Sequence, residues 1–502
     1  MFEVNKELNM VSLLEESFKD LPHEGIEEVG IVMKVADGVA LVYGLLNAAY
    51  GERIMFDGGN EGIVFDLDED FASVILLDRL KPVIEQEVAR RTGKPLSIPV
   101  GNGLLGRVIN ATGEPLDGRG EIISTEAWPV ERSAPGIADR SSISESLETG
   151  IMVIDALIPI GKGQRELIVG NMSTGKTSIA VDTILHQKGR DVICIFVSIG
   201  RKQSDTARLL DTFESHGALD YTIIVSADAS DSALDQFVAP YAGCSIGEYF
   251  MEQGKDVLIV YDNLTNHAIA YRELSLLLRR PPGREAYPGD IFYIHSRLLE
   301  RACKLSEKRG GGSLTALPLV LLQGDDISSY IPTNLISITD GQIILDVGLF
   351  NQGIRPAVNI GLSVSRVGTA AQTKVIKKMS SGFKLEIARY EELLAFAQFG
   401  SELDHISKDR IDRGMRAIEM LKQDRYETFS FVDQSLFLFL HREKIIDRFK
   451  IDDVADFIRK FALYVRDMHK HVYQAIENTQ DITDDMTREL IQIAGKFSLA
   501  FH

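Results

Sequence analysis

The sequence predicts an α/β protein in which a central domain with a parallel β-sheet lies between an N-terminal β-barrel and a C-terminal helical bundle. Short apolar runs separated by Gly and Asp turns fill residues 25–90 and are typical of a small barrel. Continuous apolar runs alternate with helical stretches within residues 91–371, which indicates a sheet covered on both faces. Glycine becomes rare and strand patterns disappear over residues 372–502, where we expect the helical domain.

Residues 1–24 form a separate segment in this prediction. Leu8, Val11, Leu14 and Phe18 recur at helical intervals, so one face of the segment is apolar. We expect a docking segment, and a frayed tail is the alternative.

The predicted barrel begins with a β-hairpin. Two apolar runs, 30–35 and 39–45, flank the dipeptide Asp37-Gly38. Asp-Gly between two strands is a strong signal for a two-residue hairpin turn. Further short apolar runs would supply other strands of the barrel: 53–56, 62–65 and 73–77.

The central domain is predicted from apolar runs that lack the polar alternation of a half-exposed sheet. Such runs are typical of parallel strands that are buried on both faces. They lie at 165–169, 191–198, 221–226, 256–262 and 318–322. A late hairpin is also expected, in which Asp340-Gly341 joins strands at 335–339 and 342–345.

A glycine-rich sequence follows the first of these strands. Residues 170–177 fit the pattern G-x-x-x-x-G-K-[ST], and an amphipathic helix is expected at 178–187. Between a strand and a helix, this pattern presents backbone N–H groups and a helix N-terminus to phosphate oxygens. The predicted nucleotide ligands are Gly170, Asn171, Met172, Ser173, Thr174, Gly175, Lys176 and Thr177. The domain is therefore predicted to be a P-loop nucleotide domain with a RecA-like sheet; a chance glycine-rich turn is the alternative.

A carboxylate at the end of another strand would complete this site. Asp262 follows the apolar run 257–261. In P-loop sites such an aspartate orients the Mg²⁺ shell, while the hydroxyl of the loop binds the ion. We expect Thr177 and Asp262 to hold Mg²⁺ beside ATP or ADP, with Lys176 on the outer phosphates. Alone, an aspartate at a strand end is usually a turn residue.

Hydrolysis would also need a group that orients or deprotonates the attacking water. The candidate position, at 199–202, holds no carboxylate. Arg201 can stabilise negative charge but is no base at neutral pH. The residues therefore predict a site that binds a nucleotide and is poorly equipped to cleave it, so the isolated chain is expected to be inactive.

Arg366 lies between small residues in the segment 363–368, SVSRVG. A lone arginine of this kind is by default part of a surface ion pair. The functional alternative is an arginine finger that completes the site of a neighbouring subunit.

The composition limits the partners. The net charge of −19 disfavours a nucleic-acid partner, because its phosphates would be repelled. No apolar run of about 18 residues occurs, so no membrane span is expected. The three cysteines, Cys194, Cys244 and Cys303, fit no metal or redox spacing and are expected to be reduced core thiols.

Four longer stretches resemble the family of F-type ATP synthase α subunits, the non-catalytic members of the soluble head. They lie in the family's order at 158–170, 276–302, 331–343 and 353–372. The resemblance runs from about residue 25 to the end of the chain. It implies a three-domain subunit that alternates with β subunits in a hexamer, peripheral to the cytoplasmic face of the bacterial inner membrane.

The resemblance also implies roles for single residues. Arg355 and Pro356 would border the adenine pocket, with Gln423 beside them. Arg366 would enter the catalytic site on the neighbouring β subunit, and Ser363, which matches the nearby serine of that strand, is expected as a second catalytic residue.

Two further partners follow from the same resemblance. Residues 281–290 match the loop that faces the central shaft, the γ subunit. The N-terminal segment 1–24 would meet the δ subunit of the stator.

The departures from the family pattern lie around the chain's own nucleotide site. The arginine-finger strand and the shaft-facing loop match the pattern, so the chain's contribution to the neighbouring site is expected to be retained. The changed positions are Met172-Ser173 for Arg-Gln, Arg201 for Gln, Asn263 for Asp, Leu321-Leu322 for Glu-Thr and Arg425 for Gln. We expect weaker or altered nucleotide binding there, as in a divergent or second-copy α subunit.

Two other functions are considered. One is a self-sufficient hexameric ATPase, such as a secretion motor or a termination helicase. The missing carboxylate near Arg201 disfavours the motor, and the net charge disfavours the helicase. The other is a scaffold subunit whose P-loop is vestigial, an alternative that the pocket departures leave open.

Overall fold

The computed structural model describes residues 28–77, 82–124, 126–322, 324, 326–398 and 404–501. The predicted docking segment 1–24 lies outside these residues. The chain divides into two compact units, Met1–Leu96 and Ser97–His502, which are described separately below.

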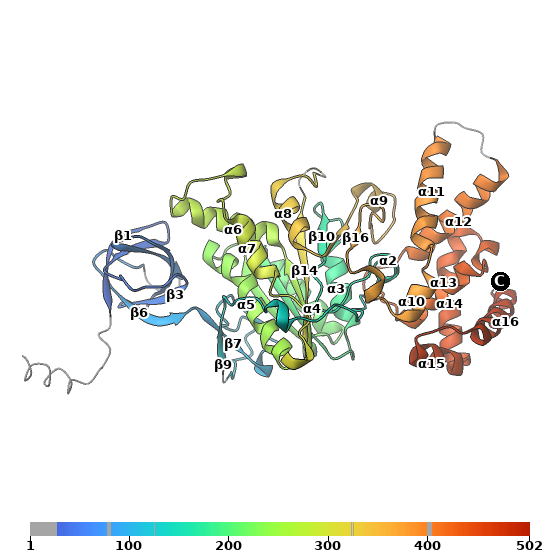
Figure 1. Cartoon of the computed structure of the whole chain (residues 1–502), viewed down its shortest axis with the longest axis horizontal. Coiled ribbons are helices and arrows are strands. Elements are labelled where there is room, and N and C mark those ends of the chain that lie inside the picture. Colours follow the sequence, from blue (N-terminus) through green and yellow to red (C-terminus); the bar gives the residue numbers. More distant parts are fainter. Residues whose placement is uncertain are drawn as a thin grey trace, which may run out of the picture. The chain divides into compact units, whose positions relative to one another are not determined.

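The first unit contains a closed six-stranded barrel, as predicted (Figure 1). Its strands follow the order β1-β2-β5-β4-β3-β6 and pair in antiparallel fashion. Asp37 and Gly38 turn the first hairpin with φ of 50° and 80°, and positive φ at both central residues is the mark of a type I′ turn. The strands are β1 Val29–Ala36, β2 Val39–Tyr43, β3 Glu52–Phe56, β4 Glu61–Leu67, β5 Phe71–Leu77 and β6 Val88–Pro95.

The second unit is built on an eight-stranded sheet in the order β16-β15-β10-β14-β13-β11-β12-β8. Neighbouring strands are parallel, except that β15 and β16 are antiparallel. The strands are β8 Val108–Ile109, β10 Leu167–Gly170, β11 Val192–Arg201, β12 Thr222–Asp228, β13 Asp256–Asp262, β14 Ser313–Leu321, β15 Gly341–Ile344 and β16 Val364–Ser365. A separate ribbon pairs β7 Ser97–Val100 with β9 Glu126–Pro129. The predicted parallel-sheet domain is confirmed.

Helices cover both faces of this sheet (Figure 1). On one face, Phe196 of β11 packs edge-on against Phe213 of α4, with ring centroids 6.2 Å apart. On the other face, Val197 lies against Gly243 of α5, where an added Cβ would be 2.5 Å from a Val197 methyl carbon. The helices of this domain are α2 Met152–Leu157, α3 Lys176–His186, α4 Gln203–Ser215, α5 Ala233–Glu252, α6 Leu264–Leu277, α7 Ile291–Leu299, α8 Tyr330–Ile338 and α9 Val347–Asn351.

The strand predicted at 335–339 is wrong, because residues 330–338 form helix α8. Ile331, Leu335 and Ile338 are buried at intervals of four and three residues, which is a helical repeat. The predicted strand, from Leu335 to Thr339, contains only the last two of these residues, so the helical repeat cannot be recognised within it. The strand predicted after Gly341 is present as β15.

The predicted helical domain is confirmed as well. Phe383 and Ile387, four residues apart on α11, are buried. The most regular pattern lies on α14, where Val454, Phe457 and Phe461 face the core together with residues of α13 and α16. The helices are α10 Lys374–Met379, α11 Phe383–Gln398, α12 His405–Leu421, α13 Phe431–Arg442, α14 Ile451–Met468, α15 Lys470–Thr479 and α16 Asp484–Ala500.

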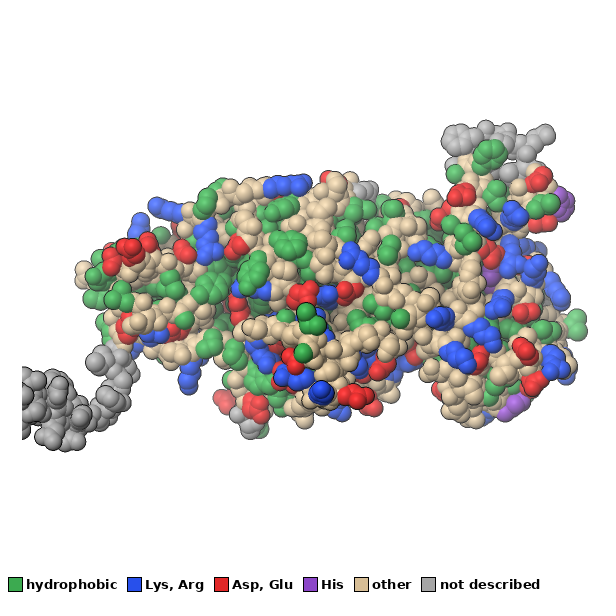
Figure 2. Space-filling model, viewed as in Figure 1, with side chains coloured by type: hydrophobic (Ala, Val, Ile, Leu, Met, Phe, Trp, Pro, Cys, Tyr) green, Lys and Arg blue, Asp and Glu red, His purple; other side chains and the backbone are tan. Residues whose placement is uncertain are grey.

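The surface and the cysteines agree with the composition. Acidic and basic side chains are interspersed on the face of the molecule that Figure 2 shows. Cys194, Cys244 and Cys303 are buried and free of disulfides. In the described part of the chain, no helix combines the length and the apolar character that a bilayer crossing requires.

Candidate nucleotide site

The glycine-rich sequence forms a loop between β10 and α3. Gly175, which precedes the first residue of α3, has a φ of 103°, a left-handed conformation that glycine adopts without strain. The Thr174 hydroxyl donates to the Asn171 carbonyl over 2.8 Å and closes the loop. Strand, loop and helix therefore occur together, as the phosphate-binding arrangement requires.

Lys176 lies across its own loop and is buried. Its Nζ donates to the carbonyl oxygens of Gly170 and Asn171, at 2.8 and 2.5 Å. Burial lowers the pKa of Lys176 to about 8; Asp262 opposes this shift and Arg201 adds to it. The ammonium is thus held at the position from which a P-loop lysine meets phosphates.

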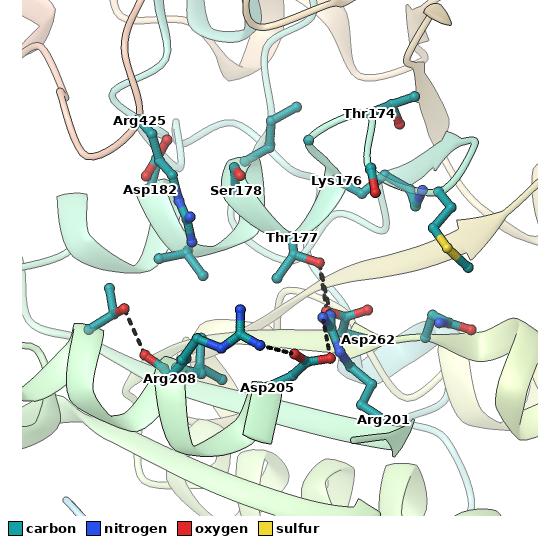
Figure 3. A pocket seen from close by; sticks show the side chains of 18 of the residues that line it. Thr174, Lys176, Thr177, Ser178, Asp182, Arg201, Asp205, Arg208, Asp262 and Arg425 are labelled. Carbon is teal, nitrogen blue, oxygen red and sulfur yellow. Dashed lines mark hydrogen bonds and ion pairs between the residues drawn. The ribbon is translucent and has the colours of Figure 1, made fainter. Parts of the chain in front are cut away.

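The structure brings Thr177 and Asp262 together, although they are 85 residues apart in the sequence. The Thr177 hydroxyl donates to Asp262 Oδ2 over 2.9 Å. Arg201 joins them: its Nη1 donates to Thr177 Oγ1 over 3.0 Å and to Asp262 Oδ2 (Figure 3). Burial raises the pKa of Asp262, and the charge of Arg201 is the largest influence against that rise.

Sheet register places these groups at one edge. Ser198 of β11 pairs with Asp262 of β13, so the residues that follow Ser198 pass beside the carboxylate. The pairing of β11 with β12 shifts by one residue between Ile199 and Arg201, where Gly200 adopts a φ of 60°. This bulge directs the Arg201 side chain toward Asp262.

Asp205 is a carboxylate near Arg201 that the sequence analysis missed. It lies on the first turn of α4, with Oδ2 3.6 Å from Arg201 Nη2 and Oδ1 3.2 Å from Arg208 Nη2. The candidate position for a base, 199–202, stops short of Asp205. Asp205 follows Arg201 at a helical i,i+4 spacing, which is the signal that identifies it. Because two arginines contact it, Asp205 is poorly placed to accept a proton from water.

These side chains line a pocket of about 1330 Å³, which also reaches Arg355, Pro356 and Gln423. Arg355 rests on the ring of Phe350, with its guanidinium carbon 4.4 Å from the ring centroid. Met172 of the loop is 77% exposed, so this side chain leaves the phosphate-facing part of the loop open.

Gln423 is buried and fixed by backbone groups. Its amide nitrogen donates to the Gly150 carbonyl over 2.7 Å and to the Glu427 carbonyl, and its amide oxygen accepts from the Met152 N–H over 3.1 Å. The backbone N–H of Gln423 donates to the Arg355 carbonyl over 2.8 Å. Gln423 therefore links the segment around Gly150 to the connection between α12 and α13 at the pocket wall.

Asp182 is a second pocket residue that the sequence analysis did not identify. It lies on α3 and accepts from the Tyr426 N–H over 3.1 Å. Burial raises its pKa to about 7, against that hydrogen bond and the charges of Arg425 and His216. Its position on the inner face of an amphipathic helix gave no chemical signal in the sequence.

Arg366 and Ser363 lie outside this pocket. Arg366 is exposed, and its Nη2 donates to the Ile336 carbonyl over 3.3 Å. Ser363 is fully buried, and its hydroxyl accepts from the Ile344 N–H over 2.9 Å. The serine thus fixes the segment against β15, while the arginine extends from the surface.

A hydroxyl next to a carboxylate is a donor set that fits Mg²⁺, as predicted for Thr177 and Asp262. However, the guanidinium of Arg201 contacts both oxygens. The two predicted magnesium ligands therefore lie together, and a cationic side chain contacts both of them.

The loop, the buried lysine and the carboxylate at the end of a parallel strand define a P-loop nucleotide-binding protein. Comparison with known families is more specific. Residues 150–365 match the ATP synthase alpha/beta family, nucleotide-binding domain, and residues 372–497 match the ATP synthase alpha/beta chain, C terminal domain.

Individual relatives agree with these matches. The ATP synthase subunit alpha of Petrotoga mobilis is 49% identical over 98% of both chains. The subunits alpha of Clostridium botulinum (strain Alaska E43 / Type E3) and Caldanaerobacter subterraneus subsp. tengcongensis are 52% and 50% identical, over 94% and 92% of both chains. The chain belongs to the family of ATP synthase alpha subunits.

Proposed function

We propose that this chain is the non-catalytic, regulatory alpha subunit of a rotary F-type ATP synthase. It binds ATP or ADP in its own pocket and supplies Arg366 to the catalytic site of a neighbouring β subunit. The observation that carries the proposal is the separation of two cationic centres: Lys176 and Arg201 lie inside the pocket, whereas Arg366 is exposed outside it.

The pocket is suited to binding rather than cleavage. The backbone of residues 170–177 and Lys176 would hold the phosphates, and Arg355 and Pro356 would border the base. Thr177 and Asp262 are the residues that could ligate Mg²⁺, and Arg201 contacts the same two oxygens. Asp205 lies beside Arg201. Because two guanidinium groups contact it, it is a poor general base.

Arg366 is the group that would act in the neighbouring site. As a phosphoryl group is transferred, negative charge spreads over its equatorial oxygens, and a guanidinium from a neighbour stabilises that charge. Ser363 supports this role indirectly. Its buried hydroxyl accepts from the Ile344 N–H, and this bond holds the segment that precedes Arg366 against β15.

Two further parts of the chain would contact other subunits. Residues 281–290 would face the central γ shaft, and residues 1–24 would meet the stator δ subunit. We place the assembled head at the cytoplasmic face of the bacterial inner membrane, where it couples ATP synthesis or hydrolysis to ion translocation.

Nucleotide binding can be tested on the purified chain. A ligand that binds only the native state raises apparent stability by mass action. We expect millimolar ATP to raise the melting temperature by about 2–5 °C, and Lys176→Ala to abolish the rise because the phosphates lose their buried ammonium. Differential scanning calorimetry measures both.

The matched control is Lys188→Ala, because Lys188 is exposed and lies just beyond α3. Its side chain donates to the His216 carbonyl, outside the phosphate loop. This variant should keep the full rise. Absence of any rise in the unsubstituted protein would favour a vestigial loop and contradict the proposal.

A further inference from the structure

A cationic side chain stands on the two oxygens that a P-loop site offers to a metal ion. Arg201 Nη1 lies 3.0 Å from Thr177 Oγ1 and also donates to Asp262 Oδ2. Its other terminal nitrogen, Nη2, is 3.6 Å from Asp205 Oδ2 (Figure 3). The guanidinium is thus held by groups from α3, β13 and α4 at once.

The backbone that carries Arg201 is fixed in this position. Gly200 occupies the bulge, and Asn266 Nδ2 donates to the carbonyl oxygens of Ile199 and Gly200 at 2.8 and 3.1 Å. An added Cβ at Gly200 would lie 2.7 Å from Gln236 Oε1 and 3.1 Å from Asn266 Cβ. Close packing and the amide therefore hold the end of β11 so that Arg201 enters the site.

Charge balance also favours this arrangement. The Asp262 side chain is 4% exposed, and a buried carboxylate requires a counter-charge. Arg201 supplies one positive charge to the same oxygen that Mg²⁺ would bind. Two cations on one carboxylate oxygen repel each other strongly at that distance, so Mg²⁺ and Arg201 compete for Asp262.

We propose that Arg201 is an internal counter-cation that takes the place of Mg²⁺, so that this site accepts metal-free ATP or ADP. The inference rests on the proposed nucleotide site and specifies the form of its ligand. A guanidinium has five N–H donors; Nη1 contacts Thr177 and Asp262, and Nη2 faces Asp205 at 3.6 Å, which is longer than a hydrogen bond. The remaining donors can bind phosphate oxygens, which guanidinium groups recognise well.

The test compares nucleotide affinity with and without metal. Isothermal titration calorimetry of the full chain with ATP is run in excess EDTA and again in millimolar Mg²⁺. For the unsubstituted protein we expect the two dissociation constants to agree within about threefold. For Arg201→Gln, which removes the charge and keeps an amide donor, metal-free affinity should fall at least about tenfold while affinity in Mg²⁺ is kept, because loss of one charge-assisted contact has roughly this effect.

Two further variants sharpen the result. Arg201→Lys retains a cation and should keep most of the metal-free affinity. Arg190→Gln is the matched control: Arg190 forms an ion pair of similar exposure with Glu148, 2.7 Å away and outside the pocket. This control should leave the ratio of the two dissociation constants unchanged.

The outcomes separate this inference from the proposed function. Binding by the unsubstituted protein only in Mg²⁺ would overturn the inference and leave the nucleotide site standing. An unchanged ratio in a folded Arg201→Gln protein would overturn it as well. No binding in either condition, or binding that Lys176→Ala does not weaken, would instead overturn the nucleotide site itself. If Arg201→Gln does not fold, the ratio of the two dissociation constants for the unsubstituted protein still tests the inference.

Discussion

At the scale of single residues, burial separates the cationic groups by function. Lys176 is 7% exposed and rests on carbonyl oxygens of its own loop, whereas the Arg366 side chain is exposed, donates to the Ile336 carbonyl over 3.3 Å and interacts electrostatically with Glu166. An arginine held so loosely keeps its donors accessible to a ligand from another subunit. A structural arginine is held differently, as Arg301 is by Glu248, Ser245 and the Val130 carbonyl.

Arg366 should affect a reaction that this chain does not perform. We predict that Arg366→Ala and Arg366→Lys assemble normally with β and γ subunits but lower multi-site ATPase activity by about 10³-fold or more, as loss of an arginine finger does. Lysine is a poor substitute because its ammonium lacks the planar fork. The measurement is ATPase rate and nucleotide occupancy of the reconstituted hexamer.

The control for this prediction is Arg488→Ala on α16, where an exposed arginine pairs with Asp485 one turn away. That variant should retain full turnover. Near-normal turnover of Arg366→Ala would show that Arg366 makes surface contacts only and does not act in a neighbouring site.

Asp182 should make stability depend on pH. Its folded-state pKa, about 7, is above the usual value of 3.8, so its stabilising contribution is complete below about pH 4 and is lost as pH rises through 7. Asp182→Asn should therefore match the unsubstituted protein near pH 4 and be more stable by on the order of 2 kcal/mol at pH 8. Asparagine can still accept from the Tyr426 N–H.

Urea unfolding of both proteins between pH 4 and 8 measures this difference. Arg425 and His216 are the charged or titratable neighbours that oppose the shift, so Arg425→Gln should enlarge it. A constant difference between the two proteins across this range would show that Asp182 is ionised throughout.

At the scale of elements, close contact between helices depends on small residues at particular positions. Gly414 of α12 lies against the ring of Tyr390 of α11, and an added Cβ would be 2.3 Å from two ring carbons. No local pattern marks this glycine, because glycine usually weakens the interior of a helix. Here it allows α11 and α12 to approach each other.

We predict that Gly414→Ala destabilises the chain by about 1–3 kcal/mol, because the Tyr390 ring must move to admit a methyl group. Gly495→Ala is the matched control, since Gly495 also lies within a helix, α16, but has open space where its Cβ would be. This control should be neutral or stabilising by up to about 1 kcal/mol, as expected from helix propensity. Chemical denaturation measures both, and a stabilising Gly414→Ala would contradict the packing argument.

At the scale of the whole molecule, Lys176, Asp262 and Arg355 line one pocket, and Arg366 lies outside it. We predict that the isolated chain hydrolyses ATP at no more than background rate, because the carboxylates near its phosphate loop are engaged: Asp262 by Arg201 and Thr177, and Asp205 by Arg201 and Arg208. Steady-state phosphate release by the purified chain tests this. Turnover that Lys176→Ala abolishes would show that the chain is a self-sufficient ATPase.

The class of protein could be predicted from the residues alone, because the relevant signals are local. The Asp37-Gly38 turn, the uninterrupted apolar strands and the glycine loop at 170–177 each depend on neighbouring residues, and the structure has all three. The loop also carried the prediction of nucleotide binding, since its backbone geometry follows from its glycines. The hairpin at Asp340-Gly341 failed because the repeat that defines α8 begins outside the short apolar run.

Which charges meet in the pocket depends on how distant segments pack in the folded chain. Arg201 and Asp262 are 61 residues apart, and their contact depends on the register of β11 against β13 and on the bulge at Gly200. The links from Gln423 to Gly150 and from Tyr426 to Asp182 join segments more than 240 residues apart. Side-chain periodicity specifies which face of an element is buried, but it does not specify the neighbour across the sheet. The contacts of Arg201 with Thr177 and Asp262 were therefore visible only in the folded chain.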